Sequence, residues 1–241
     1  MRLDQELLRR GLTSSRSKAA AAIAAGRVEV GGRVAVKPSL QVAENSLITI
    51  TADPYVSRAA HKLLQALRES RTEVPARVLD AGASTGGFTQ VLLEAGAERV
   101  YAVDVGHGQL APMLAADHRV LSWEGVNLRG LSLACVEGEP VDLVVADVSF
   151  ISLKLILAPM LAVLKPAGAA LLLVKPQFEV GRKGLNSQGV VTDAALGEQA
   201  VTGVVAAAQA LGRQCDWRGT SILPGEAGNV EHFIRLGPLV G

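Results

Sequence analysis

The chain has 241 residues, of which 49% are hydrophobic, and a net charge of +1. This length suits one large domain, or a small domain joined to a medium one. Two cysteines, Cys135 and Cys215, are too few for a disulfide framework or a cysteine-based zinc site. No stretch reaches 18 apolar residues and the first residues lack a signal-peptide core, so we expect a cytoplasmic protein without a membrane span.

The charges are distributed unevenly along the chain. Residues 1–71 contain twelve Lys and Arg against six Asp and Glu, whereas residues 72–241 contain twelve against seventeen. A basic first part joined to an acidic body is typical of a polyanion-binding module attached to another domain. A solvated surface with uneven charge has the same pattern, so charge alone leaves nucleic-acid binding open.

Residues 1–52 predict a compact unit of two short helices and a small sheet. Leucines at helical spacing in "RLDQELLRRGL" predict the first helix, and "TSSRSKAAAAIAAG" predicts a capped second helix that ends at Gly26. The valines that alternate around Gly31-Gly32 in "RVEVGGRVAV" predict a hairpin, and "SLITI" predicts a further strand. Because the chain has only two Trp, two Tyr and four Phe, any nucleic-acid binding through phosphates and shape fits better than stacking on several bases.

Residues 76–241 alternate between strand and helix patterns. The predicted strands are "RVLDAG", "RVYAVDVG", "VDLVVADVSF", "AALLLVKP", "DWRGTSILPG" and "GNVEHFIRL". The predicted helices are "GGFTQVLLEAG", "LKLILAPMLAVLKPAG" up to Pro166, and "DAALGEQAVTGVVAAAQALG" with caps at Asp193 and Gly212; "SRAAHKLLQAL" predicts one more helix ahead of the first strand. This alternation favours an α/β fold with a doubly wound, mostly parallel sheet, in which ligands bind at the carboxyl ends of the strands.

Two acidic residues at strand ends indicate the kind of cofactor. Asp80 precedes the glycine-rich turn "AGASTGGF", where a carboxylate repels a pyrophosphate but suits an ammonium or a sulfonium. Asp104 ends the next strand and suits a ribose diol, although both residues could also merely cap a helix or form a turn. S-adenosylmethionine has both features, and the residues expected to hold it are Asp80, Gly82, Ser84, Gly86, Gly87, Phe88, Asp104 and Asp147.

Lys175 follows the apolar run Leu171–Val174, so a buried strand delivers an ammonium to the ligand edge of the sheet. We expect Asp147 and Glu231 to orient this lysine and Lys62 to lie close by. A lysine that is partly desolvated beside another ammonium can act as a general base toward a hydroxyl. A structural ion-pair network at the strand ends is the alternative. The four histidines show no ligand spacing, so no metal site is predicted.

The first fifty residues resemble the S4 RNA-binding domain in the elements "RLDQ-L", "GL-SSRSKA", "I-AG-V-V-G" and "VKPS". One departure is Gly31, where the family usually has Asn before Gly, but Gly-Gly also fits a tight hairpin turn. The RNA-facing groups of that family lie in its helix pair and hairpin. The resemblance therefore implies RNA contacts from Arg2, Arg9, Arg16, Lys18, Arg27 and Lys37.

The body resembles the FtsJ-type 2'-O-methyltransferase domain in "DAGASTGGFT", "ADVSFISL", "VKPQFEVGR" and "GNVEHF". With the S4-like front and "YVSRAAHKL", the whole chain resembles the TlyA/hemolysin A family of ribosomal RNA methyltransferases. Ala59-Ala60 departs from the family, where glycine is commoner, but leaves Lys62 in register. The resemblance implies a small α+β S4 domain at 1–52, a linker at 53–60 and a Rossmann-like methyltransferase domain at 61–241, with the catalytic set Lys62, Asp147, Lys175 and Glu231.

The resemblance implies S-adenosylmethionine-dependent methylation of cytidine 2'-hydroxyls in 16S or 23S ribosomal RNA, or both, within ribosomal subunits. It implies no DNA partner and leaves the oligomeric state open. Neither cysteine has the setting of a nucleophile for base-carbon methylation, which also favours ribose as the target. The alternatives are a non-catalytic RNA-binding or ribosome-assembly protein, a nicotinamide-dependent oxidoreductase, and a membrane-lytic hemolysin, for which no basic amphipathic helix is evident.

Overall fold

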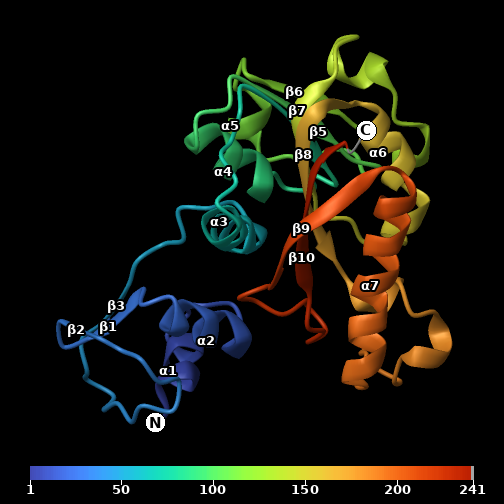
Figure 1. Ribbon diagram of the computed structural model, residues 1–241. Helices are drawn as coiled ribbons and strands as arrows, with labels where there is room; N and C mark the ends of the chain where they lie inside the picture. The colour runs from blue at the N-terminus through green and yellow to red at the C-terminus, as the bar shows by residue number, and fades with distance from the viewer. Residues whose placement is uncertain (240–241) are drawn as a thin grey trace. The chain divides into compact units, whose positions relative to one another are not determined.

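The computed structural model describes residues 1–239, which divide into two compact units, residues 1–54 and residues 55–239 (Figure 1). The division falls inside the stretch 53–60 that was expected as a linker, and the first helix of the larger unit begins within that stretch at Ala59. Within the described residues, no helix combines the length and the apolar character needed to cross a membrane.

The smaller unit has the predicted pair of helices, the hairpin and the further strand. Its elements are α1 (Leu3–Arg9), α2 (Arg16–Ala24), β1 (Val28–Val30), β2 (Arg33–Val34) and β3 (Ile48–Ile50), and the antiparallel strands have the order β2-β1-β3. Ser15 caps α2 by accepting a hydrogen bond from the backbone N–H of Lys18. Leu3, Leu7 and Ile23 are almost fully buried, so one apolar cluster joins both helices to the sheet.

The larger unit contains a seven-stranded sheet with the order β6-β5-β4-β7-β8-β10-β9. The first five strands in this order are parallel, and β10 is antiparallel to both of its neighbours. The strands are β4 (Arg77–Ala81), β5 (Arg99–Val103), β6 (Val120–Trp123), β7 (Val141–Ala146), β8 (Leu164–Val174), β9 (Arg213–Thr220) and β10 (His232–Leu239). The predicted α/β fold with a mostly parallel sheet is confirmed.

Helices cover both faces of this sheet (Figure 1). One face packs against α3 (Ala59–Ser70) and α4 (Gly87–Glu94), and the other against α6 (Leu157–Ala162) and α7 (Ala194–Ala210). A short α5 (Pro112–Ala115) follows β5. As predicted, Asp193 caps α7, where its carboxylate accepts a hydrogen bond from the N–H of Ala195.

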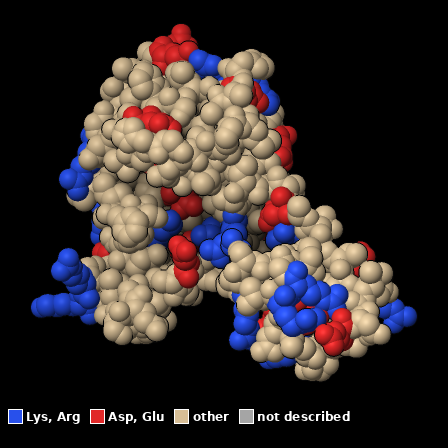
Figure 2. All heavy atoms as spheres, turned by 180° about the vertical axis from the view of Figure 1, so that it is seen from behind, with Lys and Arg blue, Asp and Glu red and all other residues tan. Residues whose placement is uncertain are grey.

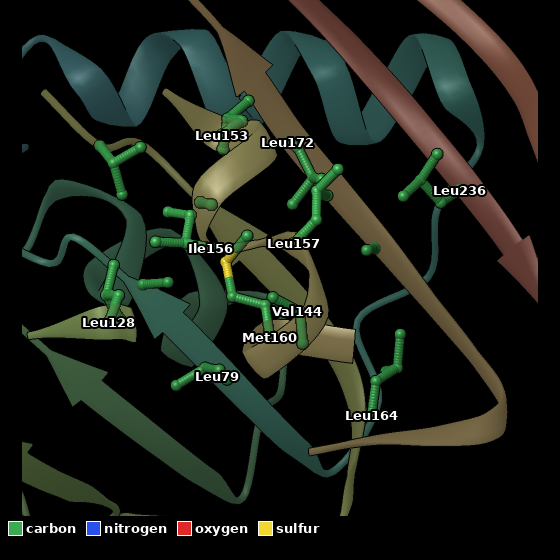
Figure 3. Packing of buried hydrophobic residues seen from close by; sticks show 14 of the residues in the cluster. Leu79, Leu128, Val144, Leu153, Ile156, Leu157, Met160, Leu164, Leu172 and Leu236 are labelled. Atoms are coloured by element: carbon green, nitrogen blue, oxygen red, sulfur yellow. The ribbon is translucent and has the colours of Figure 1, made fainter. Parts of the chain in front are cut away.

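Two apolar cores lie on opposite faces of the sheet because successive strand residues point in opposite directions. Along β8, Leu171 belongs to the core beneath α3 and α4, whereas Leu172 belongs to the core beneath α6 and α7. Full burial of one such leucine stabilises the fold by about 1.5–3 kcal/mol relative to exposure. Figure 3 shows the second core, in which Leu79, Val144 and Leu172 of the sheet meet Ile156, Leu157 and Met160.

The prediction that a helix continues up to Pro166 is wrong, because α6 ends at Ala162. A 3₁₀ turn at Leu153–Leu155 precedes α6, and β8 begins at Leu164, so Pro166 lies in a strand. Leu164 pairs with Val141 and Ala169 with Leu143, so the residues between them bulge out of the ladder. Proline fits there because it has no N–H to donate to a neighbouring strand. The strand β6 was not predicted.

Arg213 stabilises this irregular part of the sheet through hydrogen bonds to the backbone. Its guanidinium is almost fully buried and donates hydrogen bonds to four backbone carbonyls, those of Lys165, Pro166, Gly168 and Gly237. These carbonyls lie on β8 and β10, so one side chain provides donors for four backbone acceptors in this part of the sheet.

Candidate active site

The carboxyl ends of the parallel strands bring the predicted functional residues to one edge of the sheet. Asp147 follows β7 and Lys175 follows β8, which are neighbours and run in the same direction. β10 runs in the opposite direction with His232 opposite Val174, so Glu231, just ahead of β10, reaches the same edge. Lys62 comes from α3, which packs against the sheet.

All four of these residues line one cavity of about 740 Å³. Most of the glycine-rich turn after β4 lines the same cavity, as do residues after β7, β8 and β9. The cavity therefore places the predicted cofactor turn and the predicted catalytic residues in one space. Its other lining residues include Ser57, Arg58, Ser149, Phe150, Gln177, Phe178, Leu185, Gln188, Gly225, Glu226 and Asn229.

Lys175 lies between a carboxylate and a hydroxyl. Its Nζ is 2.7 Å from Asp147 Oδ1 and donates a hydrogen bond of 2.8 Å to Ser149 Oγ. Lys175 Nζ is close enough to Asp147 Oδ1 for an ion pair, but the angles do not suit a hydrogen bond. Asp147 Oδ1 therefore has no hydrogen-bond donor among the described residues. An ammonium has three N–H groups, which leaves at least one on Lys175 for a ligand in the cavity.

Lys62 and Glu231 form a second ion pair, with Nζ 2.6 Å from Oε2. Both residues are buried, and their sequence positions are 169 residues apart. Glu231 was expected to orient Lys175, but its observed partner is Lys62. A Cβ on Gly225 would approach Glu231 Oε1 to 2.5 Å, so glycine at this position leaves room for the carboxylate.

The glycine-rich turn has backbone conformations that favour glycine. Gly82 and Gly86 have φ values of +85° and +94°. A Cβ on Gly82 would lie 2.7 Å from the carbonyl oxygen of Asp147, and one on Gly86 would overlap Leu114. Ser84 has φ +47°, and its N–H donates to Asp104 Oδ2 at 2.8 Å. This backbone leaves an open wall on which a cofactor can lie closely.

Asp104 directly follows β5, and backbone N–H groups already orient its carboxylate. Its Oδ1 accepts a hydrogen bond from the N–H of Gly106 at 2.7 Å, opposite the bond from Ser84. Each carboxylate oxygen has further acceptor capacity, so Asp104 can still receive ribose hydroxyls. The open turn and this oriented acceptor fit S-adenosylmethionine.

Asp80 lies beneath the cavity and does not line it. It is fully buried, and its Oδ2 accepts a hydrogen bond of 2.6 Å from Thr89 Oγ1 on α4. Burial raises the pKa of Asp80 to about 7; the Thr89 hydrogen bond lowers it, and the nearby carboxylates of Asp147 and Asp104 raise it further. Phe88, also predicted to hold the cofactor, does line the cavity, although it is only 2% exposed and stacks on Phe233 in the core.

Four cavity residues, Ser149, Phe150, Gln177 and Phe178, were not predicted as site residues. Ser149 is the hydrogen-bond partner of Lys175. Phe150 is 92% exposed with φ +65°, and its ring centroid lies 5.3 Å from that of Phe178. Gln177 and Phe178 follow Lys175 in a 3₁₀ turn. The motifs "ADVSFISL" and "VKPQFEVGR" contain all of them, so their position beside Asp147 and Lys175 was the available signal.

The basic residues expected to contact RNA lie in the smaller unit, most of them in ion pairs. Arg2 and Arg16 both pair with Asp4, Arg9 pairs with Glu6, and Arg27 pairs with Asp53. Lys18 and Lys37 are exposed and form no ion pair within the described part of the chain. Figure 2 shows Lys and Arg on the surface of this unit with acidic side chains among them. Asp4 and Glu6 were not predicted to have a role.

Comparison with known proteins follows the same division of the chain. The FtsJ-like methyltransferase model matches residues 55–237 and the S4 domain model matches residues 1–48. The chain is 47% identical over 239 residues to the Mycobacterium tuberculosis protein named 16S/23S rRNA (cytidine-2'-O)-methyltransferase TlyA, covering 98% of this chain and 89% of that one. It is 37% identical to hemolysin A of Brachyspira hyodysenteriae, covering 97% of this chain and all of the relative.

A solved structure from Streptococcus thermophilus, named "Putative hemolysin", is similar to almost the whole chain. The TM-score is 0.76 with 35% sequence identity, and the alignment covers 99% of this chain and 88% of the other. Many more distant structures share the fold of the larger unit; one is the N-methyltransferase NodS of Bradyrhizobium japonicum, with a TM-score of 0.53, 18% identity, and coverage of 76% of this chain and 96% of that one.

Proposed function

This chain belongs to the FtsJ-like methyltransferase family and carries an S4 domain, and from that premise we propose that it methylates cytidine 2'-hydroxyls in 16S or 23S ribosomal RNA, or in both. The observation that carries the proposal is the pair of lysine–carboxylate contacts on one cavity, Lys175 with Asp147 and Lys62 with Glu231. The names of the relatives support the substrate class, and they differ in the subunit RNA: 16S and 23S in M. tuberculosis, 23S alone in Campylobacter jejuni.

The cofactor side of the cavity is the glycine-rich turn. S-adenosylmethionine, when bound, supplies a methyl group on a sulfonium, which is the electrophile that a ribose oxygen needs. Gly82 and Gly87 line the cavity and are the backbone positions that would hold it. Asp104 lies behind this wall, bonded to the N–H of Ser84, and its carboxylate would receive the ribose hydroxyls. Asp80 has no direct contact in this proposal, because it is buried beneath α4. Its ionisable carboxyl contributes to the field below the turn.

The substrate side of the cavity is built around Lys175. The target hydroxyl must lose its proton as its oxygen forms the new bond to carbon. Lys175 presents an N–H group that is not used by Asp147 or Ser149, so it can contact that oxygen. Through this N–H the Lys175 ammonium stabilises the oxygen while its proton leaves to water, and fixed contacts of this kind need no reorganisation during the reaction.

Lys62 and Glu231 set the charge balance beside that centre. Their short ion pair is mostly removed from water, where opposite charges attract more strongly than at an exposed surface. The pair fixes α3 against the segment ahead of β10, and both side chains line the cavity. Lys62 is thereby held where it can position the ribose and offset the negative charge of the neighbouring carboxylates.

The S4 unit supplies RNA affinity for the same substrate. Its exposed basic side chains suit the phosphates of a folded RNA, and RNA affinity of this kind falls as the salt concentration rises. Ribosomal subunits are the proposed form of the substrate, and we therefore place the reaction in the cytoplasm.

The test is tritium transfer from labelled S-adenosylmethionine to purified, undermodified small and large ribosomal subunits, followed by digestion and identification of the nucleosides. We expect label in 2'-O-methylcytidine. Lys175→Ala should bind the cofactor normally and lose at least about a hundredfold in transfer rate. Lys165→Ala, the same change at the other end of β8, is the matched control and should stay active. Label in a base, or no label on either subunit, would contradict the proposal.

A further inference from the structure

Asp4 is a buried carboxylate that binds two arginines at once. It is 4% exposed, and its position on α1 faces the start of α2. Arg16 approaches its Oδ2 with Nη2 at 2.9 Å and Nε at 3.3 Å, and Arg2 approaches its two oxygens with Nε at 3.0 Å and Nη2 at 3.4 Å. Each guanidinium therefore faces the carboxylate with the same edge.

The opposite edge of each guanidinium is free. Arginine has five N–H donors in a rigid plane, and contacts through Nε and Nη2 leave the donors on Nη1 unused. The side chains of Arg2 and Arg16 are 42% and 54% exposed, so their unused edges face solvent. The described residues form no other ion pair with either arginine.

Without the shared carboxylate of Asp4, the side chains of Arg2 and Arg16 would not stay side by side. Two guanidinium groups repel each other, and long arginine side chains sample many rotamers. Asp4 opposes both effects because it attracts both cations from a position fixed in the helix pair. The hydrogen bonds from Arg2 and Arg16 lower the pKa of Asp4 to about 2, so the carboxylate stays ionised at neutral pH.

We propose that Asp4 is a positioning residue for RNA binding, which holds Arg2 and Arg16 side by side so that their free edges receive neighbouring phosphates of a folded RNA. The inference rests on the proposed function, because it takes ribosomal RNA as the ligand of the S4 unit. Folded RNA presents phosphates at fixed spacing, and a preorganised pair of donors loses less entropy on binding than two mobile side chains. Glu6, which binds Arg9 and Arg10 through both oxygens, shows the same construction on α1.

Simple electrostatics predicts the opposite sign for the key variant. Asp4→Asn makes the unit more positive, so if the arginines bind only through net charge, RNA should bind more tightly. If Asp4 positions them, folded RNA should bind about tenfold more weakly despite the added charge. Glu29→Gln is the matched control, because Glu29 is exposed on β1, forms no ion pair with any described residue, and undergoes the identical charge change.

The experiment measures the Kd of the full chain for a 23S ribosomal RNA transcript and for poly(U) over a range of KCl concentrations. We expect Asp4→Asn to weaken transcript binding about tenfold, to reduce the salt slope by about one, and to leave poly(U) binding equal or tighter. Glu29→Gln should bind both RNAs equally or slightly more tightly. A tighter transcript complex with Asp4→Asn would overturn the inference.

A second variant avoids any loss of the buried carboxylate. Arg16→Lys keeps the charge and the partner but cannot form the two-pronged contact, so we expect transcript binding to weaken about fivefold or more. If Arg16→Lys bound the transcript with the affinity of the wild type, the positioning role of Asp4 would be contradicted, whether or not Asp4→Asn folds. Methyl transfer to subunits is measured in parallel: a wild-type chain that binds the transcript but transfers no methyl group contradicts the proposed reaction alone. A wild-type chain without RNA affinity overturns the inference as well.

Discussion

The buried carboxyl of Asp80 makes the stability of the larger unit depend on pH in a direction that can be worked out. Burial raises the folded-state pKa to about 7, whereas an unfolded aspartate has a pKa of about 3.9. Between these values the folded state keeps a proton that the unfolded state has lost. Stability therefore falls as pH rises through this window and levels off above it.

The difference of about three pKa units corresponds to about 4 kcal/mol, an upper value because the structure around a charged group relaxes. Asp80→Asn cannot ionise, and its side-chain oxygen can still accept the hydrogen bond from Thr89. We expect this variant to be more stable than the wild type at pH 8 by up to this amount, and the advantage should shrink toward pH 4. Thr89→Val should increase the pH dependence, because the lost hydrogen bond favours the charged form.

Urea unfolding between pH 4 and pH 8.5, followed by tryptophan fluorescence, measures this effect. Both tryptophans, Trp123 and Trp217, lie in the larger unit, so the signal reports on the unit that contains Asp80. The difference between variant and wild type cancels the titration of all other groups. An Asp80→Asn protein with the same pH slope as the wild type would refute the reasoning.

Three further predictions concern the catalytic edge and the sheet corner. Lys62→Met leaves Glu231 buried without its partner and should cost about 3–5 kcal/mol of unfolding free energy, while the double variant with Glu231→Gln should recover part of it in urea unfolding. Arg213→Leu leaves four carbonyls without a donor and should cost at least about 2 kcal/mol, which thermal unfolding with Arg213→Lys as comparison would check. Glu179 follows the turn Pro176–Phe178, and its carboxylate accepts hydrogen bonds from Ser152 Oγ and the N–H of Leu153, so it joins the segment after β8 to the segment after β7. For Glu179→Gln we expect kcat to fall about tenfold with the cofactor Kd unchanged, and a kcat like that of the wild type would contradict this role.

The strand Leu171–Val174 could be predicted because an uninterrupted apolar run suits burial on both faces of a parallel sheet. These residues are indeed completely buried. The helix expected up to Pro166 failed because apolar residues continue from α6 into β8 without a break, and periodicity cannot separate a short helix from a bulged strand. β6 was missed because Val120–Trp123 is a half-exposed edge strand of four residues with no buried run.

The candidate site was predicted in its members but not in its pairings. Strand ends and family motifs indicated the four residues that line the cavity. That Glu231 pairs with Lys62 depends on an antiparallel strand between two others, and the sequence carries no local signal for that order. The burial of Asp80 depends on the face to which the pleat turns its side chain, and α4 covers that face with Thr89.

The position of β10 between β8 and β9 also sets the order of events when the protein is made. β9 has β10 as its neighbour in the sheet, so residues 213–220 have no ladder partner until residues 232–239 have left the ribosome. Glu231 can approach Lys62 only at the same moment. A nascent chain can thus hold a complete S4 unit while the edge of the sheet that carries the candidate site is still unfinished.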